Sequence, residues 1–186
     1  MTFKSWKMRL NAILNAACLL CGVLFFVYCS KAPVNLSPLS SAPAMDLERI
    51  AGDWSVAARI PTYFDPDVAL MNVKIEKDVE GKFRGQWIFS AEKDGSMKEY
   101  NFSIAPGLGK DSTKWSVKAF WLLKFDLRVL EFSGDYSWIA VGSEDRRYFW
   151  LLTTGKSSDG ALVEAILKRQ YENGFSKEHI LFTNKL

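Results

Sequence analysis

The chain has 186 residues, enough for one domain with a substantial core. Its 24 Lys and Arg residues and 21 Asp and Glu residues give a formal net charge of +3, but Lys4, Lys7 and Arg9 lie in the first 29 residues, which contain no acid. The remaining chain is therefore neutral, so its charge gives no support for nucleic-acid binding, and we expect no nucleic-acid partner.

The first 29 residues are predicted to be a signal peptide. The bases precede an apolar run from Ala12 to Tyr28, and the run ends at Cys29. This placement resembles a bacterial lipoprotein signal, which implies that Cys29 is lipidated and becomes the mature N-terminus. The apolar run is at the short edge for a membrane span, so an uncleaved anchor stays open. Cleavage of a non-lipid signal after Ala44 is a second alternative.

Residues 30–45, with the sequence SKAPVNLSPLSSAPAM, consist mainly of Pro, Ser and Ala. Such a composition cannot bury a core, so we predict a flexible tether here. The folded domain is predicted to span residues 46–186. No cysteine follows Cys29, so this domain has no disulfide and no thiol chemistry.

The domain begins with a Gly-x-Trp sequence at the start of a predicted strand. Trp54, Val56, Ala58 and Ile60 alternate with polar positions that include Arg59. A Trp at the first inward position buries roughly 150–250 Å² and is suited to plug one end of a barrel.

Seven further segments repeat this alternation, with turns about every 8–14 residues. They cover residues 71–75, 83–89, 100–104, 115–121, 125–129, 136–141 and 147–154. Sequential hairpins without long crossovers predict an all-β fold, an eight-stranded antiparallel up-and-down β-barrel.

A single helix is predicted after the strands, packed outside the barrel. Its apolar face is expected to carry Leu162, Ala165, Ile166 and Arg169, and Gly174 is a natural residue to end it. A short last strand is predicted at residues 180–182.

From about residue 46 to the end, the chain resembles the lipocalins, and within them the bacterial outer-membrane lipocalins and their apolipoprotein D-like relatives. The sequence GDWSVAARIPTYF matches the first family motif, and GDY at residues 134–136 matches the second. The resemblance implies a ligand-binding calyx. It also implies that five motif residues are structural: Gly52, Trp54, Gly134, Asp135 and Tyr136. Family members usually end the eighth strand with an Arg that lies across the motif Trp, and here Thr154 has that place.

An eight-stranded barrel is just wide enough to be filled or to hold one small ligand. The inward positions are apolar, with small residues among large ones, which favours an apolar ligand over a fully packed core. Because inward-facing charge is scarce, a strongly anionic head group is expected to stay near the mouth. The predicted ligand-binding residues are Val56, Ala58, Ile60, Met71, Val73, Trp87, Phe89, Phe102, Val117, Trp121, Phe125, Leu127, Trp138, Tyr148 and Trp150.

Three functions are compatible with these residues. The first is a lipocalin tethered to a bacterial envelope membrane that stores or transports fatty acids, lysophospholipids or similar amphiphiles. The second is an envelope interaction module with a packed core and no dedicated ligand. The third is an enzyme acting on a bound lipid, which is disfavoured because no Cys is present in the domain and the single His, His179, follows the helix.

We therefore expect no enzymatic activity, no cofactor and no metal site. The expected partners are a fatty acid or lysophospholipid and a membrane, reached through the N-terminal lipid, and a homodimer is left open. The expected location is the outer membrane, facing the periplasm, with a secreted or signal-anchored protein as the alternatives.

Overall fold

The computed structural model describes residues 36–40, 42–63, 68–91, 95–107, 111–119, 123–155 and 159–183. Residues 37–186 form one compact unit. The predicted signal peptide, its Cys29 and the predicted ligand-binding residue Trp121 lie outside the described residues.

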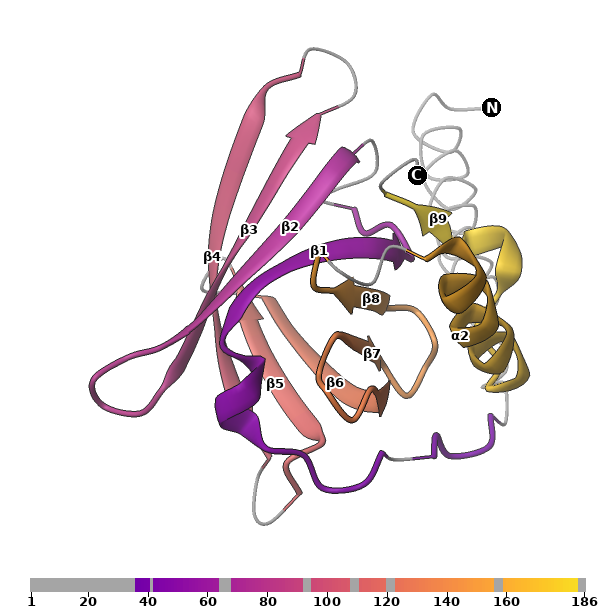
Figure 1. The fold of residues 1–186 in the computed structure, drawn as a ribbon, viewed down its shortest axis with the longest axis horizontal. Coiled ribbons are helices and arrows are strands. Elements are labelled where there is room, and N and C mark those ends of the chain that lie inside the picture. Colours follow the sequence, from indigo (N-terminus) through magenta and orange to yellow (C-terminus); the bar gives the residue numbers. More distant parts are fainter. Residues whose placement is uncertain are drawn as a thin grey trace, which may run out of the picture. The chain divides into compact units, whose positions relative to one another are not determined.

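Eight antiparallel strands form a closed up-and-down barrel, which confirms the predicted fold (Figure 1). Each strand pairs with the next in sequence, and β1 pairs with both β2 and β8 to close the barrel. The strands are β1 (Gly52–Arg59), β2 (Val68–Lys77), β3 (Phe83–Ala91), β4 (Met97–Pro106), β5 (Lys114–Ala119), β6 (Leu123–Phe132), β7 (Trp138–Gly142) and β8 (Phe149–Thr153). A ninth strand, β9 (Leu181–Phe182), pairs with Ala58 and Arg59 at the end of β1, beyond the part of β1 that pairs with β2.

The two ends of the barrel differ. We call the end where β1 begins the floor and the opposite end the mouth. The short 3-10 helix η1 (Leu47–Ile50) leads into β1 at the floor. The β2–β3, β4–β5 and β6–β7 connections lie at the floor, and the other hairpin connections lie at the mouth. A second 3-10 helix, η2 (Lys177–His179), precedes β9.

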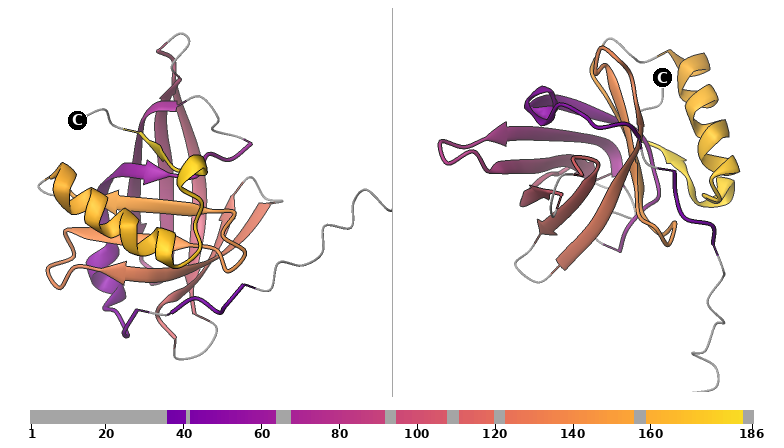
Figure 2. Two further views of the ribbon diagram at one scale, coloured as in Figure 1. Left: turned by 90° about the vertical axis from the view of Figure 1, so that its right-hand side faces the viewer. Right: turned by 90° about the horizontal axis from the view of Figure 1, so that it is seen from below.

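The helix α2 (Gly160–Glu172) lies against the outside of the barrel wall (Figure 2). The carboxylate of Asp159 accepts a hydrogen bond from the Ala161 N–H and caps its first turn. Its buried side chains are those of Val163, Ile166, Leu167 and Gln170. Of the predicted face, Ile166 is buried and Leu162 packs against the same cluster, whereas Ala165 and Arg169 are exposed, so the prediction is wrong for these two residues.

Buried side chains fall into two clusters on opposite sides of the same wall. One fills the barrel interior. The other lies between α2 and the outer faces of β1, β6, β7 and β8. All five residues of β7 and of β8 are buried, because these two strands have apolar neighbours on both faces.

A β-bulge in β1 changes which of its side chains face inward. Val56 pairs with Leu152 and Ala58 with Leu151, so Ala57 is an extra residue. Val56 lies in the interior cluster, whereas Ala58 and Ile60 lie in the cluster under α2. The prediction that Ala58 and Ile60 face the interior is therefore wrong, because the bulge reverses the alternation.

Trp138 was also predicted to face inward, and this is wrong. It lies in the cluster under α2, together with Ala140, while Ile139 and Val141 face the interior. The residues of β7 are all apolar or small, so no alternation of polar and apolar residues indicates which side chains face outward.

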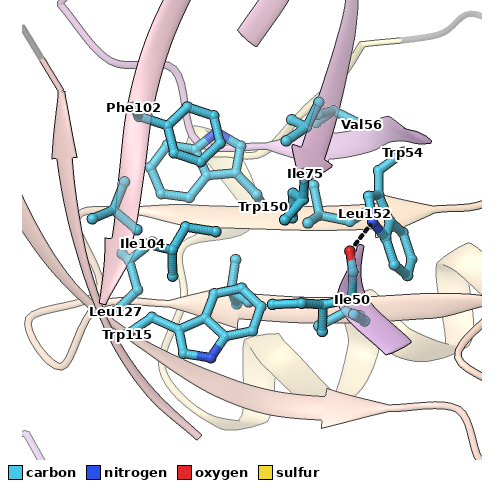
Figure 3. Close-up of a cluster of buried hydrophobic side chains, with 14 of the residues drawn as sticks. Ile50, Trp54, Val56, Ile75, Phe102, Ile104, Trp115, Leu127, Trp150 and Leu152 are labelled. Carbon is cyan, nitrogen blue, oxygen red and sulfur yellow. Dashed lines mark hydrogen bonds between the residues drawn. The ribbon is translucent and has the colours of Figure 1, made fainter. Parts of the chain in front are cut away.

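Trp54 closes the floor of the barrel (Figure 3). Its side chain is 3% exposed, and its indole N–H donates a 2.9 Å hydrogen bond to the Ile50 carbonyl at the end of η1. Thr154 has the place where the lipocalin resemblance implied an Arg, and its backbone N–H donates to the Ser137 carbonyl at 2.8 Å. No cation reaches Trp54 from this position, since threonine carries no charge.

A different cation holds the floor. Arg49 of η1 lies 4.1 Å from the ring centroid of Tyr136 and donates hydrogen bonds to the carbonyls of Gly134 and Asp135. Tyr136 has a φ of 61°, and its hydroxyl accepts a 2.6 Å hydrogen bond from the Asp46 N–H. Hydroxyl groups of two flanking serines lower the pKa of the Asp135 carboxyl to about 2. The second motif thus fixes η1 onto the β6–β7 turn.

Residues 37–40 and 42–45 lie against the barrel, so the prediction of a flexible tether is wrong for these residues. Leu39 and Met45 are buried. The backbone N–H of Leu39 donates to the Glu144 carboxylate at 3.2 Å, and that of Met45 donates to the Ser112 hydroxyl at 2.9 Å. The buried side chains of Leu39 and Met45, together with these two hydrogen bonds, hold the Pro- and Ser-rich segment on the barrel. The segment is drawn in indigo in Figure 1, where it leads into η1.

Replacing Trp54 tests its role in closing the floor. We expect Trp54→Ala to lower the free energy of unfolding by about 3–5 kcal/mol, since a large buried ring is removed. Trp54→Phe keeps most of the packing but loses the hydrogen bond to Ile50, and is expected to lose about 1 kcal/mol beyond its packing change. Urea denaturation followed by circular dichroism measures both. Val79→Ala, at a fully exposed position, is the control; a loss below about 1 kcal/mol for Trp54→Ala would contradict the plug.

Candidate ligand-binding cavity

The barrel interior encloses an apolar cavity of about 40 Å³. Its wall combines residues from seven strands, β2 to β8, and some of these residues are labelled in Figure 3. The lining residues are Val73, Ile75, Trp87, Phe102, Ile104, Trp115, Val117, Leu127, Val141, Trp150 and Leu152. None of them carries a charge, so this cavity offers burial for a hydrocarbon group.

A layer of aromatic rings lies between this cavity and the mouth. Phe125 is at its centre, with its ring edge-on to Trp87, Tyr148 and Trp150 at centroid distances of 6.3, 5.0 and 6.4 Å. The rings of Tyr148 and Trp150 are stacked at 6.0 Å. These pairs have the geometries that aromatic rings prefer, and they fill much of the interior above the cavity.

Gly85 of β3 explains why the cavity is small. A Cβ atom at this position would lie 2.1 Å from the Phe102 ring. The glycine therefore admits this ring against the β3 backbone, where it stacks on Trp87 at a centroid distance of 4.6 Å. Gly85 therefore leaves no room for a ligand, because Phe102 occupies the space.

The structure brings most of the predicted ligand-binding residues together. Six of them line the cavity, and five more belong to the interior cluster or pack against it. The six are Val73, Trp87, Phe102, Val117, Leu127 and Trp150; the five are Val56, Met71, Phe89, Phe125 and Tyr148. Their contact with a ligand stays a prediction.

Five lining residues were missed by the prediction. Ile75, Ile104 and Trp115 continue the alternation of β2, β4 and β5 toward the floor, so the pattern itself could have included them. Val141 and Leu152 lie on strands buried on both faces, where alternation gives no guide.

Arg59 is the most unexpected interior residue. The sequence predicts it on the outer face, but the bulge at Ala57 places it opposite Trp150, whose side chain faces the interior. Directly paired residues of antiparallel strands project to the same face, so Arg59 is on the inner face of β1, near the mouth. Arg59 is only 1% exposed. No short-range sequence signal marks the bulge that puts it there.

Chemical groups for catalysis or metal binding are not gathered at the cavity. His179 lies in η2 and is exposed, outside the barrel. In the part of the chain that the structure describes, no group of three or more His, Cys, Asp or Glu side chains could hold a metal ion. Among the same residues, no helix has the length and apolarity needed to cross a membrane.

Comparison with known proteins gives one family and several similar structures. Residues 45–185 match the family described as Lipocalin-like domain. Insecticyanin from the tobacco hornworm Manduca sexta superposes with a TM-score of 0.63 at 13% identity, covering 83% of this chain and 88% of that one. Lobster apocrustacyanin A1 gives 0.59 at 14% identity, covering 83% and 93%, and the cockroach allergen Per a 4 gives 0.58 at 11% identity, covering 81% and 95%. No curated protein matches the sequence.

Adding one methyl group at Gly85 tests whether Phe102 is wedged against it. We expect Gly85→Ala to lower the free energy of unfolding by about 1–3 kcal/mol, because the Phe102 ring must leave its position. Replacing Phe102 by Leu in the same protein should recover part of the loss. Thermal unfolding measures both, with Gly155→Ala, where a Cβ meets nothing within 4 Å, as the matched control. Equal stability of the two alanine variants would show that Phe102 is not confined.

Proposed function

This chain belongs to the lipocalin-like family, whose members generally bind small hydrophobic ligands and are generally not enzymes. From this premise we propose that it stores or transports fatty acids, lysophospholipids or similar single-chain amphiphiles inside its barrel. The observation that supports this most is the continuous apolar lining of the interior, which runs from Trp54 at the floor to the aromatic layer near the mouth. Such a lining suits an acyl chain.

The enclosed cavity is too small for such a chain as it stands. Pockets for small-molecule ligands typically have about 300–1,000 Å³, whereas this one has about 40 Å³. An acyl chain would have to displace rings of the aromatic layer around Phe125. Each aromatic pair contributes about 0.5–1.5 kcal/mol beyond burial, and ten buried methylenes contribute roughly 8 kcal/mol. The four ring pairs around Phe125 contribute about 2–6 kcal/mol together, so the hydrocarbon gain exceeds their loss when the displaced rings stay buried.

A packed core favours a second function. If the aromatic layer does not open, the barrel is an interaction module that contacts another envelope protein through its mouth, and the small cavity is the observation in favour of it. Mass spectrometry of lipids extracted from the purified protein separates the two. Co-purified single-chain lipid supports the carrier, and its absence together with no binding of added lipid supports the module.

Ligand binding inside the barrel predicts unequal effects for two neighbouring substitutions in β5. Val117 lines the cavity and Lys118 points outward. We expect fatty acids to bind with a dissociation constant of about 1 µM and to bind more tightly as the chain lengthens. Val117→Glu should weaken binding by roughly tenfold or more, because its carboxylate must be desolvated in an apolar wall. Lys118→Glu should change it little.

Titration of the tryptophan fluorescence measures these affinities, since Trp87 and Trp150 line the cavity. Circular dichroism of both variants checks that they fold. Equal effects of the two substitutions, or an affinity independent of chain length, would contradict an interior site.

We also propose that an acylated Cys29 holds the domain on the outer membrane, facing the periplasm. The supporting observations are the apolar run that ends at Cys29 and the docking of residues 37–40 and 42–45 on the barrel. Only residues 30–36 then separate the lipid from the domain. Seven residues span at most about 25 Å, so the barrel would stay close to the lipid surface from which it takes its ligand.

The anchor is tested by Cys29→Ser in a bacterial envelope. We expect the wild-type protein to incorporate labelled palmitate and to fractionate with membranes, because two or more acyl chains bind durably. The variant should incorporate no label and should leave the membrane fraction or remain unprocessed. Cys21→Ser is the matched control and should behave as wild type. Membrane binding of the Cys29 variant with wild-type processing would favour a different signal.

A further inference from the structure

Arg59 places a positive charge inside an otherwise apolar chamber. It is the last residue of β1, and it pairs with Trp150 of β8 on one side and with Leu181 of β9 on the other. The ring of Trp150 belongs to the aromatic layer. Arg59 therefore lies at the level of Trp150, on the mouth side of the cavity, where the head group of an inserted amphiphile would be.

The other charges near the interior are consistent with an anionic ligand. Lys98 of β4 pairs with Phe89, whose side chain faces inward, and is exposed at the mouth. Among the strand positions that the structure describes, none that faces the interior carries Asp or Glu. Lys77, at the floor end, shares the inner face through its pairing with Phe83, but it is exposed and forms an ion pair with Glu48 of η1. The buried part of the chamber is thus apolar toward the floor and carries Arg59 toward the mouth, which complements a molecule with an acyl tail and a negative head.

Arginine is suited to this role by its geometry. Its planar guanidinium presents five N–H donors in a fixed fork, and two parallel donors match a carboxylate or a phosphate. Such a group can keep hydrogen bonds to the protein and still direct two donors at a ligand.

We propose that Arg59 binds the anionic head group of the ligand, a carboxylate or a phosphate monoester, and so orients the acyl chain toward Trp54 at the floor. This inference rests on the proposed function and specifies the class of lipid. It specifies the expectation that an anionic head group stays near the mouth by naming the residue that binds it. A neutral amphiphile of the same chain length should bind less well.

The test compares head groups on one chain. Hexadecanoic acid and hexadecanol differ only in the head group, and palmitoyl lysophosphatidic acid and monopalmitoylglycerol provide the phosphate arm. Wild-type protein should bind each acid more tightly than its neutral partner by roughly ten- to a hundredfold. Arg59→Met should abolish this preference and leave the affinity for hexadecanol within about twofold. Arg84→Met, on the outer face of β3, is the matched control and should keep the preference.

The two arms identify the head group, since the larger preference marks carboxylate or phosphate as the native chemistry. Equal affinity of wild-type protein for acids and neutral partners would overturn the inference and leave the carrier function intact. No binding of any of the four lipids would instead refute the carrier function. Equal weakening of acid and alcohol in Arg59→Met would assign Arg59 a purely structural role and also overturn the inference.

Arg59→Lys is a second variant, which keeps the test possible if Arg59→Met does not fold. It keeps the charge but loses the fork, so the preference for acids should persist at a smaller ratio. Thermal unfolding of both variants shows which of them can be used. A folded Arg59→Lys protein with no preference left for either acid, while hexadecanol still binds, would show that a cation at this position does not select the head group and would overturn the proposal. Loss of hexadecanol binding as well would overturn the proposal.

Discussion

One extra residue in β1 determines which side chains the barrel encloses. With Ala57 bulged, Ala58 and Ile60 turn toward α2 and Arg59 turns inward. A second register shift in β6, between Val129 and Glu131, does the same for Leu130, which also packs under α2. Because side chains alternate with a period of two, one inserted residue exchanges the two faces of everything that follows it. The helix-binding surface and the interior cation thus have a common origin.

The wall formed by β7 and β8 has to satisfy two cores at once. Ile139 and Leu152 pack into the interior, while Ala140 and Leu151, one step along each strand, pack under α2. At Gly142 a Cβ would lie 2.6 Å from the Phe175 ring, so glycine is what lets the chain after α2 approach the wall. Such a doubly buried wall is stiff, since neither face is free to relax into solvent. Adaptation to a ligand therefore has to come from elsewhere in the barrel.

The sequence predicted the fold and the part of the site where one strand face is polar. Val73, Phe102 and Val117 lie on strands whose outward positions carry charged or polar side chains, and their inward direction was correctly assigned. The same reasoning failed for Ala58 because a bulge reversed the alternation, and for Trp138 because both faces of β7 are apolar. The burial of Leu39 was not predicted, because a single apolar residue in a Pro- and Ser-rich segment forms no periodic pattern that would indicate it.

The floor and the mouth of the barrel are held by different kinds of contact. At the floor, hydrogen bonds from Trp54 and Arg49 to backbone carbonyls, together with the Arg49–Tyr136 contact, fix η1 in one position. Toward the mouth, Phe125 is held by edge-on ring contacts without a hydrogen bond of its own side chain. Ring contacts can re-form with an acyl chain, whereas a buried carbonyl that loses its donor cannot be satisfied by hydrocarbon. A ligand is thus expected to enter by rearranging the aromatic layer above an unchanged floor, with its head group stopping at the depth of Arg59.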